Sequence, residues 1–174
     1  MFGFGKKKKE AEAPVTTPAG VGEQVVAPVT GSYKQLSAVS DPIFAQGTLG
    51  DGFAVQPSGG AVVAPISGTV KILHDTLHAF AIQSDAGAEV LVHIGIDTLE
   101  LEGRGFKALI AKGDVVTAGQ PIVEVDWVAV EPQVPSTEVM VVVTNGKKFS
   151  LIKTNDSEHN VAAGQPVASL NPAA

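Results

Sequence analysis

Short apolar runs, separated at close intervals by turn-forming residues, are the feature that most constrains this chain. The runs are rich in Val, Ile, Ala and Thr, and Gly, Pro, Asp or Asn interrupts them about every eight to twelve residues. Runs of this length suit strands better than helices. We therefore predict an all-β fold, an antiparallel β-sandwich or barrel with little helix. The predicted strands are 25–26, 61–64, 68–73, 79–83, 90–96, 122–125, 139–144 and 167–170.

Composition supports one β domain and excludes several kinds of chemistry. The chain has 174 residues, of which 11 are proline and 17% are charged. A domain of this size buries roughly 70% of the surface that its unfolded chain exposes, so one core is sufficient. The sequence contains no cysteine, which excludes disulfides, thiolate metal sites and thiol nucleophiles.

The first 22 residues differ in composition from the rest. They contain Lys6 to Lys9 and a stretch rich in Ala, Pro, Thr and Gly, so we predict a disordered polybasic tail at 1–22 and a domain at 23–174. Phe2 and Phe4 beside the lysines suggest weak contact with an anionic membrane.

Charge and hydropathy limit the partners and the cellular compartment that we expect for this chain. Of the net charge of -6, the tail contributes +2, from four lysines and two glutamates, which leaves -8 on the domain. An acidic domain repels phosphate backbones, so nucleic acid is not expected as a partner. We expect a cytoplasmic protein, because no apolar run is long enough to span a membrane and the start lacks the apolar region of a signal peptide.

One pair of similar hexapeptides and one pair of similar heptapeptides predict structurally related corners. Residues 27–32 (APVTGS) resemble 64–69 (APISGT), and residues 116–122 (VTAGQPI) resemble 161–167 (VAAGQPV). The spacings differ, which argues against a tandem solenoid. We therefore expect two intertwined halves of one sandwich or barrel, with the alternative that Pro and Gly merely recur at turns.

The most informative segment runs from Asp75 to Leu99 and contains two of the four histidines. Two apolar strands flank the polar turn 84–87, which predicts a β-hairpin. With Asp85 and Ala86 as a two-residue loop, His78 lies directly opposite His93, and their rings can touch. The same face is then expected to carry Thr76, Phe80, Ile82, Leu91 and Gly95.

Two facing imidazoles suit phosphoryl transfer. A neutral imidazole is a nucleophile near pH 7 and needs no other base. Transfer needs one histidine as the phosphoryl acceptor and a neighbour that stabilises the phosphoryl oxygens, and we predict that His93 and His78 share these roles, while apolar neighbours exclude water. Alternatively, both histidines are structural, or they hold zinc. Zinc prefers four ligands, so a carboxylate of a partner or waters would have to complete the site. His74 and His159 are assigned no role.

The segment 87–99 (GAEVLVHIGIDTL) resembles the active-site signature of the glucose-type Enzyme IIA family of the phosphoenolpyruvate-dependent sugar phosphotransferase system. The resemblance covers roughly residues 25–170. The further matching positions are Phe44-Ala45, Gly50 to Gly52, Ala64-Pro65, Gly68-Thr69, Thr76, His78 to Phe80, Glu100-Leu101 and Gly103 to Phe106.

The resemblance implies a phosphotransferase component with a phosphohistidine. It implies that Nε2 of His93 takes a phosphoryl group from the histidine phosphocarrier HPr and passes it to a cysteine of an Enzyme IIB domain. It further implies that His78, held by Thr76, supports transfer, and that Asp97 and Gly95 lie beside the reactive ring. The implied apolar surface for partners comprises Ile43, Phe44, Leu49, Phe80 and Leu91.

The family also suggests further partners and leaves the sugar open. No cofactor is required, and zinc at His78 and His93 would need a partner's carboxylate. Regulated permeases or kinases are possible partners. Glucose is the default sugar, with N-acetylglucosamine, β-glucosides, sucrose and trehalose as alternatives. His74 and Leu91 stand where some relatives carry aromatic residues.

Two other classes of protein compete with this interpretation. Residues 64–70 and 113–119 resemble corners of biotinyl or lipoyl carrier barrels, but neither Lys71 nor Lys147-Lys148 has the flanking residues of a modified lysine. The other class is a binding module whose histidine pair only holds a metal.

Overall fold

The computed structural model describes residues 22–173, and it is built almost entirely from strands. They are β1 (Glu23–Val26), β2 (Thr30–Gln35), β3 (Asp51–Gly59), β4 (Val62–Val63), β5 (Gly68–Leu73), β6 (Ala79–Gln83), β7 (Glu89–Ile96), β8 (Phe106–Ala108), β9 (Val115–Val116), β10 (Pro121–Val125), β11 (Ser136–Val143), β12 (Phe149–Lys153), β13 (His159–Val161) and β14 (Pro166–Pro172). Helical segments are one turn or little more: η1 (Leu36–Ala38), α2 (Pro42–Ala45), η2 (Thr98–Leu101), α3 (Trp127–Val130) and η3 (Glu131–Gln133).

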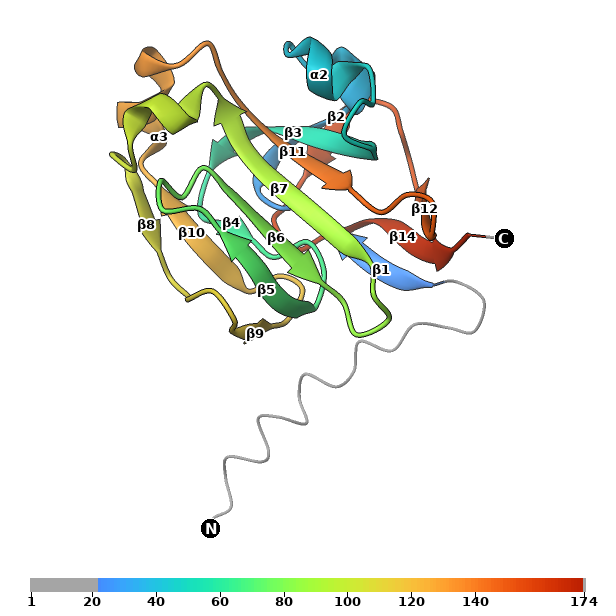
Figure 1. Ribbon diagram of the computed structural model, residues 1–174. Coiled ribbons are helices and arrows are strands. Elements are labelled where there is room, and N and C mark those ends of the chain that lie inside the picture. Colours follow the sequence, from blue (N-terminus) through green and yellow to red (C-terminus); the bar gives the residue numbers. More distant parts are fainter. Residues whose placement is uncertain (1–21, 174) are drawn as a thin grey trace.

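The strands form three antiparallel sheets around one main core (Figure 1). The largest sheet has the order β13-β2-β3-β11-β7-β6-β5-β9, and the smaller sheets have the orders β1-β14-β12 and β4-β10-β8. Buried apolar side chains from all three sheets meet in the main core, for example Val25, Ile122 and Val92. The prediction of an all-β antiparallel sandwich with little helix is confirmed.

A second, smaller apolar cluster lies on the other face of the large sheet. It joins the helical segments η1 and α2 to β3, β7 and β11, and consists of Leu36, Val39, Phe44, Ala54, Ile96, Met140 and Val142. Because side chains alternate along a strand, Met140 faces this cluster while Val139 and Val141 face the main core. Strands β7 and β11 are therefore covered on both faces at this end of the sheet.

The two pairs of similar peptides form equivalent corners. Ala27 donates its N–H to Gln165 O at 2.8 Å, and Ala64 donates to Gln120 O at 2.9 Å. In return, Gly164 N donates to Ala27 O and Gly119 N to Ala64 O, at 2.9 and 2.8 Å. Each corner also leads into a strand pair, Gly31 with Val161 and Gly68 with Val116. The predicted relation between the two pairs of corners is confirmed.

The β6–β7 hairpin differs from its prediction by one residue. Ala79 pairs with His93 and Gln83 with Glu89, so the predicted pairing of His78 with His93 is wrong. The loop has three residues, closed by hydrogen bonds between Ser84 and Ala88, and Gly87 adopts the left-handed backbone with φ of 103°. A three-residue loop with glycine at this position is a common hairpin connection.

The changed register exchanges the two faces of β6. Phe80 and Ile82 point into the main core and are 0% and 1% exposed. Ala79 and Ala81 instead share the outer face with His93 and Leu91. The predicted placement of Phe80 and Ile82 beside the histidines is therefore wrong, since a shift of one residue moves every side chain of a strand to the other face.

Two further predictions concern the N-terminal tail and segments that could span a membrane. The predicted disordered tail at 1–22, with its membrane contact through Phe2, Phe4 and the lysines, lies outside the described residues apart from Gly22. Among the helices of residues 22–173, none combines the length and apolar character needed to cross a lipid bilayer.

Candidate active site

His93 lies on β7, between β6 and β11, and is half-buried. Its Nδ1 is 2.8 Å from the main-chain oxygen of Gly95. A carbonyl oxygen only accepts hydrogen bonds, so Nδ1 must carry the proton and Nε2 keeps its lone pair. Gly95 has φ of +76°, and a Cβ there would stand 2.5 Å from Cγ2 of Thr98. Glycine thus permits the turn that brings this carbonyl to the ring.

His78 lies one residue before β6, and its ring contacts His93 by a route that strand alternation does not predict. The ring centroids are 5.2 Å apart and meet edge to face at 75°. By alternation His78 would share the inner face with Phe80. However, β6 begins only at Ala79, and Leu77 before it has φ of 58°, so His78 does not follow the strand. The predicted contact of the two imidazoles is confirmed.

Thr76 contacts His78 as the family resemblance implied. The Thr76 hydroxyl oxygen is 2.6 Å from Nδ1 of His78, so Nε2 is the nitrogen of His78 that this contact leaves free. The main chain of His78 is also fixed, because its carbonyl accepts from Ile94 N at 2.7 Å. Both rings are therefore held through Nδ1, which leaves both Nε2 atoms free of these contacts.

Burial keeps both imidazoles neutral. Burial, together with the charges of His93 and His74, lowers the pKa of His78 to about 4. Burial also lowers the pKa of His93, although the Gly95 hydrogen bond and the negative charge of Asp41 act in the opposite direction. Near pH 7 the pair is consequently uncharged, which is the protonation state that an imidazole nucleophile needs.

The structure separates the predicted partner-binding residues into three groups. Ile43 in α2 and Leu49 shortly after it are 53% and 41% exposed, and Leu91 is half-buried on the outer face of β7. Phe44 is buried, with its ring 5.1 Å from that of His93. Phe80 is fully buried in the main core, so its predicted place on a partner surface is wrong.

Asp97 lies at the start of η2 with a left-handed backbone, and its side chain is exposed. Within residues 22–173 its carboxylate makes no hydrogen bond. Asp97 is therefore near the strand end that carries His93 and Gly95, but the structure assigns it no contact with either imidazole.

Two residues near the histidine pair were not predicted. The ring of His74 lies 4.8 Å from that of His78, with an interplanar angle of 31°. Asp41 caps α2 by accepting from Ile43 N at 2.8 Å, and its charge acts on His93. Asp followed by Pro is a helix-start signal that indicates the cap. No local pattern indicates that this cap stands beside His93.

The histidine pair alone is an incomplete metal site. Within the part of the chain that the structure describes, no three His, Asp or Glu side chains are grouped so that they could hold a metal ion. His78 and His93 offer two nitrogen ligands through Nε2, whereas zinc prefers four ligands. Zinc binding completed by a partner's carboxylate stays a prediction.

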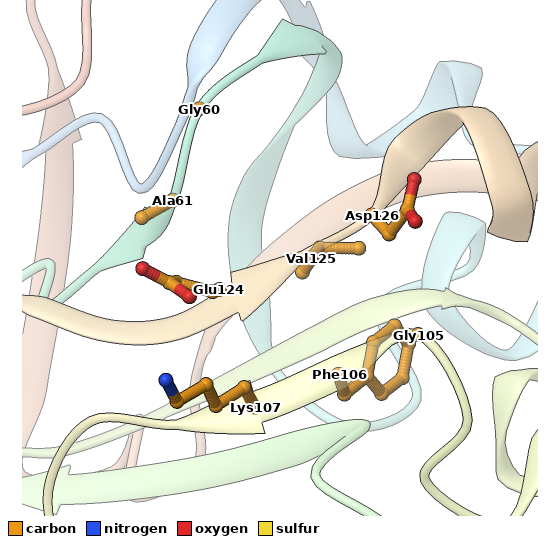
Figure 2. A pocket seen from close by; sticks show the side chains of 8 residues that line it. All are labelled: Gly60, Ala61, Gly105, Phe106, Lys107, Glu124, Val125 and Asp126. Atoms are coloured by element: carbon orange, nitrogen blue, oxygen red, sulfur yellow. The ribbon is translucent and has the colours of Figure 1, made fainter.

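A cavity of about 470 Å³ lies elsewhere and contains none of the predicted site residues (Figure 2). Its charged side chains are Lys107 on β8, Glu124 on β10 and Asp126 directly after β10. The cavity contains no histidine. His93 lies instead on the outer face of the large sheet, away from this cavity.

Fold and site together define a class of protein: an antiparallel β-sandwich that presents a neutral histidine with a free Nε2 beside a second imidazole. Residues 23–149 match the family described as the phosphoenolpyruvate-dependent sugar phosphotransferase system, EIIA 1. The chain belongs to this family and is a phosphocarrier of the sugar phosphotransferase system. The biotinyl or lipoyl carrier and the metal-holding module are not favoured.

Individual relatives agree with the family. The chain is 36% identical over 154 residues to the glucose-specific EIIA component of Bacillus cereus, covering 88% of this chain and 86% of that one. It is 43% identical over 148 residues to the glucose-specific EIICBA component of Streptococcus pneumoniae, covering 85% of this chain but spanning only 20% of that protein. Glucose permease IIA from Mycoplasma capricolum superposes with a TM-score of 0.76 at 37% identity, covering 83% and 93% of the two chains.

Proposed function

We propose that Nε2 of His93 accepts a phosphoryl group from phosphorylated HPr and passes it to a cysteine of an Enzyme IIB domain. The observation that carries this proposal is the 2.8 Å contact between Nδ1 of His93 and Gly95 O, which leaves Nε2 as the free nucleophile. In the first step the donor's N–P bond breaks as the N–P bond to Nε2 forms. In the second step that bond breaks as the cysteine thiolate forms an S–P bond.

His78 is proposed to stabilise the phosphoryl oxygens in flight. With the Thr76 hydroxyl donating to Nδ1 of His78, the proton of this imidazole resides on Nε2. That N–H then donates to a phosphoryl oxygen as charge builds there. Because the pKa of His78 is lowered to about 4, this donor is a neutral imidazole near pH 7.

The surroundings of His93 support handover between proteins. Phe44 covers one side of the His93 ring, and the exposed Ile43 and Leu49 offer apolar contact area next to it. A docked partner would bury these side chains and exclude water, which otherwise hydrolyses the reactive N–P bond. We propose that HPr and the Enzyme IIB domain use this surface in turn.

The sugar and the cellular location follow from the same proposal. Two of the relatives described above are named glucose-specific and the third is a glucose permease component, so we propose glucose as the sugar whose uptake the chain serves. A carrier between HPr and a permease domain works on the cytoplasmic side of the membrane, and we place this chain there.

The central test is phosphoryl transfer from phosphoenolpyruvate through Enzyme I and HPr. We expect one acid-labile, base-stable phosphoryl group on the wild-type chain and none on His93→Gln. His159→Gln is the matched control, because Nδ1 of His159 also contacts a main-chain oxygen, that of Ser157, at 2.6 Å, while β13 is the edge strand distant from β7. Labelling of His93→Gln at the wild-type level would contradict the proposal.

A further inference from the structure

A buried carboxylate lies close to the site and has no part in the proposed transfer. Glu138 on β11 is 2% exposed. It accepts from Lys34 Nζ at 2.6 Å, from Ser136 Oγ at 2.9 Å, and from Ser40 through both Oγ and N at 3.1 and 3.2 Å. A buried ion pair adds little net stability compared with apolar packing. The location of Glu138 relative to His93 is therefore more informative than its contribution to stability.

The bonds from Ser40 fasten a covering segment to β11. This covering segment, Leu36–Gln46, comprises η1, Ser40, Asp41 and α2. Ser40 is followed directly by Asp41, whose side chain caps α2, and Phe44 comes four residues after Ser40. Phe44 packs beside Met140 in the smaller apolar cluster and lies 5.1 Å from the His93 ring. Glu138 thus holds the segment at a point four residues before its contact with His93.

An irregularity in β11 places Glu138 opposite the residue that orients His93. Ser136 pairs with Ile96 and Val139 with Ile94, so Thr137 and Glu138 both stand opposite Gly95. Two residues opposite one define a β-bulge, which redirects side chains next to a site. The Gly95 carbonyl in turn binds Nδ1 of His93. Glu138 is therefore linked both to the strand that orients His93 and to the segment that covers it.

The charge of Glu138 is maintained by its partners. Burial raises the pKa of this carboxyl group, but the hydrogen bonds from Lys34, Ser40 and Ser136 outweigh burial and leave the pKa below its ordinary value. The carboxylate is consequently ionised at neutral pH, and an ionised acceptor forms stronger hydrogen bonds than a neutral one.

We propose that Glu138, with Lys34 and Ser40, is a positioning residue that holds the covering segment against β11 and so sets Phe44 beside His93. This inference rests on the proposed function, in which His93 is the phosphoryl acceptor. Glu138 touches no reacting atom. It acts through Ser40 and the α2 cap.

Glu138→Met is the decisive variant, because methionine retains the volume but cannot accept from Ser40. We expect phosphoryl transfer from HPr to slow about tenfold, because a displaced Phe44 lets the His93 ring leave its productive orientation. Amide hydrogen exchange should accelerate in residues 36–46 and not in β7. Glu138→Gln retains an acceptor for Ser40 and should recover most of the lost rate.

Tyr33→Phe is the matched control for a loss of stability alone. It removes a part-buried hydrogen bond of β2, from the Tyr33 hydroxyl to Asp156 at 2.7 Å, on the strand that also carries Lys34. We expect unchanged transfer. The NMR shift of the His93 ring proton reports its distance from Phe44, and it should change in Glu138→Met but not in Tyr33→Phe.

The possible results distinguish a positioning role of Glu138 from a folding defect of the variant and from a failure of the proposed role of His93. Wild-type transfer and an unchanged His93 shift in Glu138→Met would overturn the inference, while labelling of His93→Gln would overturn the proposed function instead. If Glu138→Met does not fold, Ser40→Ala takes its place. It removes the Oγ bond at an exposed residue and should slow transfer about threefold. Unchanged transfer in Ser40→Ala, with unchanged exchange in 36–46, would again overturn the inference.

Discussion

One main-chain hydrogen bond decides which nitrogen of His93 can react. Gly95 O holds the proton on Nδ1, and the lone pair therefore resides on Nε2. The carbonyl reaches the ring because Gly95 adopts φ of +76°, in a space where a Cβ would collide with Thr98 Cγ2 and approach Ser136 O to 3.1 Å. A single glycine thus determines both the orientation and the tautomer of the nucleophile.

His78→Gln should separate phosphoryl acceptance from onward transfer. His93 retains its Gly95 contact in this variant, so we expect labelling from HPr to persist. Onward transfer to an Enzyme IIB domain should fall about 100-fold, the usual effect of losing a positioned proton donor. Rapid-quench measurement of both steps tests this. Onward transfer at the wild-type rate would exclude His78 from the chemistry.

At the scale of the element, contacts from a distant loop decide the hairpin register. Asn145, which follows β11, accepts from Glu89 N at 2.9 Å and donates to Gly87 O at 2.9 Å. The buried Ser84 hydroxyl oxygen accepts from Ala88 N at 3.1 Å. Together these bonds select the three-residue loop, and no short-range pattern in residues 84–88 indicates the bonds from Asn145.

Asn145→Ala should therefore destabilise the hairpin while leaving the site intact. We expect the free energy of unfolding to fall by about 1 to 2 kcal/mol, since two hydrogen bonds are lost. Asn145→Asp retains the acceptor for Glu89 N and should lose about half as much. Urea denaturation measures both changes. Phosphoryl transfer should stay at the wild-type rate, because the side chain of Asn145 forms hydrogen bonds with Gly87 and Glu89 and with neither imidazole. A large loss of transfer in Asn145→Ala would contradict this separation.

Strands rich in apolar residues could be predicted from the sequence. Strands that form mainly because neighbouring strands pair with them could not. Strands β5 and β6 have the predicted bounds, Gly68–Leu73 and Ala79–Gln83. The prediction missed β2 and β3, which contain Ser32, Lys34, Gln56 and Pro57 and lack a clear alternation. Pairing with β11 and β13 forms these strands, so the tertiary context overrides their local propensity.

At the scale of the whole molecule, buried titratable groups couple stability to pH. His78 and His93 have folded pKa values below that of an unfolded histidine, so the unfolded chain binds more protons as the pH falls below about 6.5. Stability is therefore lost as the pH decreases toward 4. Glu138 also has a lowered pKa, and its contribution is lost at still lower pH, as the carboxylate becomes protonated in the folded state.

The pH dependence can be assigned to one residue. Between pH 7.5 and 5.0, a histidine with a folded pKa of about 4 should account for about 2 kcal/mol of the loss in the free energy of unfolding. His78→Gln cannot titrate and should lose correspondingly less over this range, whereas His159→Gln should behave as the wild type. Urea denaturation at both pH values measures the difference. An unchanged pH dependence in His78→Gln would show that His78 titrates alike in the folded and unfolded chains.

The sequence by itself determined the fold class and the paired corners, and it placed His78 and His93 close together in one hairpin. Short apolar runs and turn residues are local signals, and a hairpin brings its two strands together whatever the exact loop length. The family resemblance assigned the reactive nitrogen, and the bond from Nδ1 of His93 to Gly95 O agrees with it.

Only the tertiary structure decided the register, the burial of Phe80 and the cover over His93. These depend on residues far apart in the chain: Asn145 at the hairpin, and Glu138 and Lys34 beneath Ser40. A one-residue shift costs nothing in local propensity but exchanges the faces of a strand, so only packing against other strands can select between the registers. That packing leaves Nε2 of His93 available beside His78 and covers the ring with Phe44.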